Sequence, residues 1–108
     1  MSGPRIAVIG AGAWGTTLAD LLARKPLPVT IWARETDVVE GINRDHLNRA
    51  FLPDSPLAPG LRATGDLSAA ARDAEVIVCA APSHAARAVM AEVASAVRGT
   101  PLVVIVSK

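Results

Sequence analysis

Three glycines with a fixed spacing are the residues of this sequence that point most directly to chemistry. Residues 6–19 read IAVIGAGAWGTTLA, and Gly10, Gly12 and Gly15 stand where an apolar strand gives way to a helical pattern. Glycine weakens regular structure unless the chain must turn sharply or approach another group closely. In this context the spacing is typical of a turn that binds the pyrophosphate of a dinucleotide at the positive end of a helix. The alternative is a tight turn without a ligand, which the strand-to-helix context disfavours.

The end of the second apolar strand suggests which dinucleotide binds. Residues 29–35 read VTIWARE, and Ala33 stands where a carboxylate would bind a free ribose 2′-hydroxyl. Arg34 follows it, and a guanidinium can bind a 2′-phosphate through two hydrogen bonds. We therefore predict NADP(H) as the favoured cofactor and leave NAD(H) open. Glu35 is interpreted as a charge near the start of the next helix, and the alternative for Arg34 is a solvated surface arginine.

Other reactive side chains give weaker signals. His84 stands at the start of a predicted helix, where a solvent-facing histidine is a stronger interpretation than an acid or base. Lys108 follows the last predicted strand and would face a ligand there, with a surface lysine as the alternative. Cys79 is interpreted as an inert core residue because its strand is apolar. His46 carries no signal beyond solvation, and the histidines and the cysteine lack metal-ligand spacing, so no metal site is predicted.

These residues need a scaffold that brings them together, and the sequence alternates between strand and helix patterns. Apolar segments predict buried strands at residues 5–9, 29–32, 75–80 and 102–106 and a short edge strand at 61–64. Helical patterns fall at residues 13–24, 36–48, 67–72 and 84–97. The alternation predicts a single α/β domain over residues 1–108, a Rossmann-like doubly wound parallel sheet with strand order 3-2-1-4-5. Ligands bind such sheets at the carboxyl ends of the strands.

Local signals refine these elements. Thr36, Asp66 and Ser83 are expected as N-caps of the helices that follow them. Residues 49–60, RAFLPDSPLAPG, are too long for an ordinary connection and predict a loop that is either functional or mobile. The buried stripe of the first helix is expected to consist of Leu18, Leu21 and Leu22.

Composition narrows the classes of protein to which the chain can belong. It has 108 residues and a formal net charge of +1, without the basic excess that nucleic acid or an anionic membrane would favour. A single cysteine allows no disulfide within the chain, and no segment has the pattern of a signal peptide or a membrane span. We therefore expect a soluble, cytoplasmic protein without a nucleic-acid partner; the small-molecule substrate is implied only by the resemblance described below.

With these residues in place, the chain resembles the N-terminal part of NAD(P)-dependent glycerol-3-phosphate dehydrogenases of the bacterial type. The resemblance covers essentially all 108 residues. It is carried by the segments GAGAWGTTLA, IWAR, NRDHLNRAFLP, APSHAARAV and the closing VSK. Thr17 and Ala81 depart mildly from the family pattern, which usually has alanine and valine there.

The resemblance implies a role for each matching residue. Gly10, Gly12 and Gly15 would cradle the pyrophosphate, and Arg34 would bind the 2′-phosphate. Lys108 would reach both the nicotinamide and the substrate. The other residues implied to touch the cofactor are Ala13, Trp14 and Phe51.

The family also implies an activity, the interconversion of sn-glycerol 3-phosphate and dihydroxyacetone phosphate, which supplies glycerophospholipid synthesis. It implies a mostly helical second domain that carries the general-base lysine and the substrate pocket beyond residue 108. No catalytic residue is therefore predicted within this chain, which alone is expected to be inactive. A stand-alone dinucleotide sensor without catalysis is the alternative function, and a homo-oligomer stays open.

Overall fold

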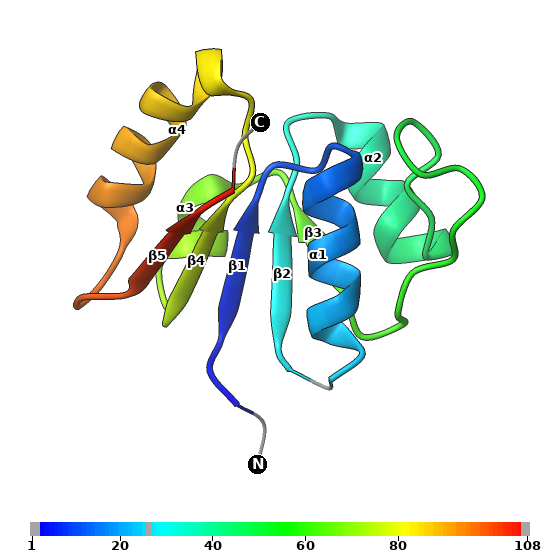
Figure 1. Ribbon diagram of the computed structural model, residues 1–108, viewed down its shortest axis with the longest axis horizontal. Helices are drawn as coiled ribbons and strands as arrows, with labels where there is room; N and C mark the ends of the chain where they lie inside the picture. The colour runs from blue at the N-terminus through cyan, green and yellow to red at the C-terminus, as the bar shows by residue number, and fades with distance from the viewer. Residues whose placement is uncertain (1–2, 26, 107–108) are drawn as a thin grey trace.

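The computed structural model describes residues 3–25 and 27–106, which form a five-stranded parallel sheet with helices on both faces (Figure 1). The strand order is β3-β2-β1-β4-β5. The predicted fold class and strand order are therefore confirmed, with β1 and β4 paired at the centre, Ile9 beside Cys79. The strands are β1 (Ile6–Ile9), β2 (Val29–Trp32), β3 (Arg62–Thr64), β4 (Val76–Cys79) and β5 (Leu102–Ile105).

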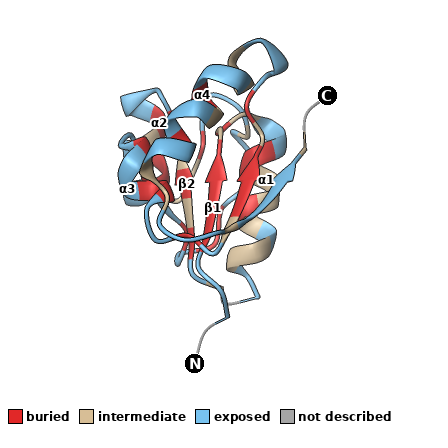
Figure 2. Ribbon diagram, turned by 90° about the vertical axis from the view of Figure 1, so that its left-hand side faces the viewer, coloured by how far each residue is buried: buried red, intermediate tan, exposed pale blue. Residues whose placement is uncertain are grey.

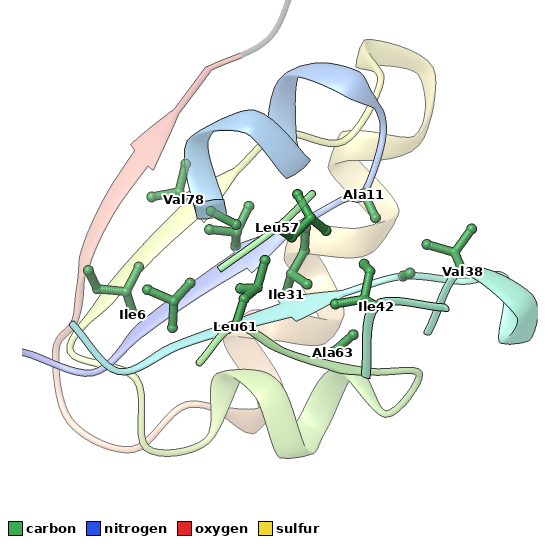
Figure 3. Close-up of a cluster of buried hydrophobic side chains, with 13 residues drawn as sticks. Ile6, Ala11, Ile31, Val38, Ile42, Leu57, Leu61, Ala63 and Val78 are labelled. Carbon is green, nitrogen blue, oxygen red and sulfur yellow. The ribbon is translucent and has the colours of Figure 1, made fainter. Parts of the chain in front are cut away.

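Each face of the sheet packs against a different set of helical segments. One aliphatic cluster joins the sheet to α1 (Ala13–Ala23), α2 (Thr36–Glu40) and the π-helical η1 (Gly41–Asp45), as Figure 3 shows. A second cluster joins the opposite face to α3 (Leu67–Ala71) and α4 (Ser83–Ala96). All five strands point the same way, so their carboxyl ends and the starts of α1 and α4 share one edge of the sheet (Figure 1).

The second helical segment is shorter than predicted. We expected a helix over residues 36–48, but α2 passes into η1 at Gly41 and helical structure ends at Asp45. His46 then adopts a left-handed conformation with φ 55°, which a continuing helix does not allow. The chain therefore leaves the helix three residues early, and Asn48 belongs to the loop that follows.

Two of the three predicted N-caps are one residue out of place. Glu35 and Pro82, both with extended backbones, precede α2 and α4, and Thr36 and Ser83 are already helical. At the start of α4 the carbonyl oxygen of Pro82 accepts from the N–H groups of Ala85 and Ala86 at 2.9 Å each. Asp66 is confirmed as a cap, because its carboxylate accepts from the N–H of Ala69 at 3.1 Å.

Two predictions of burial are wrong. All four residues of β5 are exposed, including Leu102 and Ile105 at 64% each, because β5 is an edge strand and neither hydrophobic cluster extends over it (Figure 2). In α1, Leu18 and Leu22 pack against the core, but Leu21 is 53% exposed. The buried residues of that helix are instead small: Gly15, Thr16 and Ala19.

Across the described part of the chain, every helix is too short or too polar to cross a membrane.

Candidate functional site

The site is built around the turn from β1 into α1, and Gly10 makes that turn. Gly10 has φ +116°, a conformation that strains any other residue. A Cβ there would also lie 3.0 Å from the backbone of Ala80 and Ala81, at the end of β4. Gly10 is thus required both by the sharp turn and by the close approach of the β4 end.

Gly15 is required by packing alone. A Cβ at this position would collide with the carbonyl oxygen of Gly10 and lie 3.1 Å from the side chain of Ala80. The first turn of α1 therefore sits directly on the end of β1, as the glycine spacing predicts. This contact brings the free N–H groups of the helix start to the edge of the sheet.

Gly12 differs from both, because nothing within the described protein requires a glycine there. It is the N-cap of α1, with φ −71° and ψ −175°, angles that any residue adopts. A Cβ at Gly12 would meet no atom within 4 Å. Gly12 instead borders a cavity, so the missing side chain leaves space open on the side where a ligand would approach.

That cavity has a volume of about 310 Å³ and opens at the carboxyl ends of the central strands. Its walls come from the glycine turn, the end of β2, the long loop, the end of β4 and the first turns of α4. This is the crevice beside the switch point, where parallel sheets of this order bind ligands. The lining residues are Gly10, Ala11, Gly12, Trp32, Arg34, Glu35, Phe51, Ala80, Ala81, Pro82, His84, Ala85 and Val89.

The end of β2 presents both a cation and an anion to the cavity. Ala33 is 1% exposed and donates its N–H to the Thr64 carbonyl at 3.1 Å, so its side chain is part of the core. Arg34 is exposed, lines the cavity and forms no salt bridge within the described residues. Glu35 is the N-cap of α2, as its predicted position near that helix implies, but it also lines the cavity. The end of β2 therefore presents two opposite charges to the cavity in adjacent positions.

Phe51 reaches the cavity from a loop that is docked onto the protein. Leu57 and Leu61 are buried in the cluster beneath α1 (Figure 3). The N–H of Ala58 donates to the Asp20 carboxylate at 2.7 Å, which ties the loop to that helix. Of the two alternatives for residues 49–60, the placement of Phe51 in the cavity wall supports the functional loop.

Asn48 and Thr16 are buried polar residues that sequence reasoning did not single out. Both are 0% exposed, and the Asn48 amide donates to the Thr16 hydroxyl and to the Ala11 carbonyl. An asparagine just after a helical pattern suggests a turn, but its contact with a residue 37 positions earlier has no local signal.

The remaining candidate residues divide between the cavity, the core and the surface. His84 is exposed and lines the cavity, so its solvent-facing position is confirmed. Cys79 is a buried core residue, as predicted. His46 is half-buried at the end of η1. No group of three metal-ligating side chains occurs within residues 3–25 and 27–106.

Two arginines outside the cavity shift the pKa of a nearby carboxylate, that of Asp45. The pKa of Asp45 is lowered from its ordinary value, first by a hydrogen bond from Arg49 at 2.8 Å, with further attraction from Arg49 and Arg44 against the opposing effect of desolvation. This cluster stands at the end of η1, where the long loop begins. The ion pair between Asp45 and Arg49 joins the end of η1 to the start of the loop, so it anchors the loop and takes no part in the cavity.

The family to which the chain belongs follows from comparison with known sequences. The family described as the N-terminus of NAD-dependent glycerol-3-phosphate dehydrogenase matches residues 5–108. The chain is a member of this glycerol-3-phosphate dehydrogenase family. The resemblance stated from the sequence motifs is thereby confirmed.

Relatives within the glycerol-3-phosphate dehydrogenase family match nearly the whole chain. A glycerol-3-phosphate dehydrogenase (NAD(P)+) of Geobacter sulfurreducens is 47% identical over 104 residues, which are 96% of this chain and 31% of the relative. One of Sphingopyxis alaskensis is 44% identical over 94 residues, 87% of this chain and 28% of the relative. The crystal structure of the Coxiella burnetii glycerol-3-phosphate dehydrogenase superposes with a TM-score of 0.89 at 32% identity, covering 97% of this chain and 32% of that one. The chain thus spans about a third of the length of the relatives that it matches.

Not all residues that the glycerol-3-phosphate dehydrogenase resemblance assigned to the cofactor border the cavity. Gly10, Gly12, Arg34 and Phe51 line it. The other three described residues do not: Gly15 is buried beneath the turn, and Ala13 and Trp14 are exposed on the first turn of α1. Lys108, the residue assigned to both cofactor and substrate, lies outside the described residues.

Proposed function

We propose that this chain is the dinucleotide-binding domain of a glycerol-3-phosphate dehydrogenase and that it favours NADP(H) over NAD(H). The observation that carries the proposal is Gly12, a glycine that neither conformation nor packing requires, at the mouth of the cavity. A pyrophosphate seated there would receive the N–H groups of the α1 start and its positive dipole end. The family membership and the names of the relatives support the same ligand.

Arg34 is the proposed partner of the 2′-phosphate. It is exposed, lines the cavity and forms no salt bridge within the described residues, so its guanidinium is available to a ligand. Buried Ala33 leaves no carboxylate at the position that would select a free 2′-hydroxyl. Glu35 opposes a 2′-phosphate by its charge, so the selectivity is the difference between the attraction of Arg34 and the repulsion of Glu35.

The proposed reaction interconverts sn-glycerol 3-phosphate and dihydroxyacetone phosphate. A bound nicotinamide cofactor supplies or accepts the hydride. The protein must add an acid–base group within hydrogen-bond reach of the reacting oxygen. Among the described cavity residues His84 is the one titratable candidate besides Arg34 and Glu35, and its exposed place on the first turn of α4 is not that of a held catalytic base. We propose that this base and the substrate pocket belong to a further domain, and that Lys108 contacts cofactor and substrate.

Enzyme assays test the proposal that this chain binds the cofactor and a further domain supplies the catalytic base and the substrate pocket. The protein in its natural length and the 108-residue chain are each given NADPH and dihydroxyacetone phosphate, and the absorbance of reduced nicotinamide is followed. We expect clear turnover for the natural protein and none for the 108-residue chain. Cofactor binding without turnover by the natural protein would contradict the enzyme and favour a dinucleotide sensor.

A further inference from the structure

Asn48 links three parts of the candidate cofactor site through one buried side chain. Its amide Nδ2 donates to the carbonyl oxygen of Ala11 and to the hydroxyl of Thr16, each at 2.9 Å. Its amide oxygen accepts from the N–H of Phe51 at 3.3 Å. The glycine turn, helix α1 and the loop wall of the cavity therefore meet at a residue that is 0% exposed.

The bond to Ala11 sets the direction of the neighbouring N–H group. The Ala11 carbonyl and the Gly12 N–H belong to the same peptide unit, which is trans and planar, so they point in opposite directions. Because the carbonyl faces the buried Asn48, the Gly12 N–H faces away from it. Ala11 and Gly12 both line the cavity, so this orientation presents the N–H to the proposed pyrophosphate.

Hydrogen bonds on both its nitrogen and its oxygen hold the Asn48 amide in one orientation. Both Nδ2 hydrogens and the Oδ1 acceptor are occupied, and a flipped amide would place its oxygen against the Ala11 carbonyl. The side chain of Ala11 is itself part of the core cluster (Figure 3), so the peptide unit is held from both sides. A hydrogen bond to a peptide carbonyl also polarises the N–H of the same peptide, which makes it a better donor.

We propose that Asn48 is a positioning residue for the pyrophosphate: it fixes the Ala11–Gly12 peptide so that the Gly12 N–H meets the ligand. The proposal rests on the proposed cofactor function. It goes beyond that function because the residue that orients the phosphate-binding peptide, Asn48, lies outside the glycine motif. Asn48 does not line the cavity, so its effect on the ligand is indirect.

Ligands that differ by one phosphate test the proposal on the protein in its natural length. NADPH is titrated by energy transfer from indole to reduced nicotinamide, since Trp32 lines the cavity, and ADP and AMP by displacement of NADPH. The ratio of the AMP and ADP dissociation constants measures the contribution of the second phosphate. In Asn48→Ala we expect NADPH binding to weaken by about tenfold or more and the advantage of ADP over AMP to shrink by a similar factor.

Two further sets of variants separate positioning from stability. Thr16→Val removes one acceptor of the Asn48 amide without a void and should reduce the ADP advantage by a smaller factor, whereas Thr16→Ser keeps the acceptor and should restore it. Asn43→Ala is the matched control, because the Asn43 amide makes the same two kinds of bond, 2.9 Å and 2.8 Å, to the backbone of Ala63, away from the cavity. It should lower the unfolding midpoint and leave the AMP-to-ADP ratio unchanged.

The outcomes distinguish this proposal from the one on which it rests. Wild-type protein that fails to bind NADPH overturns the cofactor function and, with it, the role of Asn48. Wild-type protein that binds, together with an unchanged AMP-to-ADP ratio in both Asn48→Ala and Thr16→Val, overturns the role of Asn48 alone.

Discussion

The carbonyl oxygen of Gly10 occupies the space that a side chain at position 15 would need. The turn at Gly10 therefore packs directly against the first turn of α1, and this close contact is possible because position 15 has no side chain. The contact places the first turn of α1 on the end of β1, beside the cavity. It also separates the structural glycines of the motif from Gly12, which has open space around it.

Gly15→Ala should destabilise the fold. The new Cβ meets a backbone oxygen that cannot move without shifting the end of β1, and such overpacking costs about 1–3 kcal/mol. The free energy of unfolding in urea measures the loss. Gly60→Ala is the control, since a Cβ there meets nothing within 4 Å. Equal stability of the Gly15→Ala variant and the wild type would show that α1 does not rest on Gly10 as described.

Arg34→Ala should remove the preference for the phosphorylated cofactor. A hydrogen bond to a charged group contributes about 1.5–3 kcal/mol, so NADPH should bind about tenfold or more weakly. NADH, without the 2′-phosphate, should change little. Calorimetric titration of both cofactors checks this, with Arg62→Ala as a control in β3, where Arg62 lines a separate cavity. Equal losses for NADPH and NADH would contradict the assignment of Arg34.

The fold and the glycine turn at the candidate site could be predicted because their signals are local. The strands other than β3 are short segments rich in Val and Ile, and the glycine spacing falls between a strand and a helix. The prediction of a buried β5 is wrong because its Leu-Val-Val-Ile run resembles those of the buried strands. The predicted strand order, which places β5 at an edge of the sheet, is the better guide to its exposure. Asn48 could not be recognised either, because its partner Ala11 lies 37 residues away.

Acid should weaken the anchoring of the long loop through Asp45. The folded pKa of Asp45 is lowered, chiefly by the hydrogen bond from Arg49, below its ordinary value of 3.8. The carboxylate therefore contributes stability above about pH 4, and this contribution is lost as the pH falls through the folded pKa. In Arg49→Ala the pKa of Asp45 should rise toward 3.8, as measured by NMR titration of the carboxyl carbon. An unchanged pKa in this variant, or the same rise in the distant Arg98→Ala, would contradict a hydrogen bond from Arg49 as the cause.

The 108-residue chain taken alone should self-associate through β5. Its outer edge offers backbone hydrogen-bonding groups beside four exposed apolar side chains, a combination that favours pairing between sheets. Light scattering should show species larger than a monomer for the wild-type chain and fewer of them for Leu102→Lys with Ile105→Lys. Leu21→Lys changes a similarly exposed leucine on α1 and should have no such effect. A wild-type chain that stays monomeric at high concentration would contradict self-association through β5.

The central claim, that a dinucleotide pyrophosphate lies against Gly12, is tested most directly by NADPH titration of Gly12→Val beside Gly60→Val, in the protein of natural length. A Cβ meets no atom within 4 Å at either position, but of the two glycines Gly12 alone lines the candidate cofactor cavity. We predict that both variants keep the wild-type unfolding midpoint, that Gly60→Val binds NADPH normally, and that Gly12→Val loses binding by about a hundredfold, the effect of a cost near 3 kcal/mol. Normal binding of NADPH by a folded Gly12→Val variant would contradict the claim.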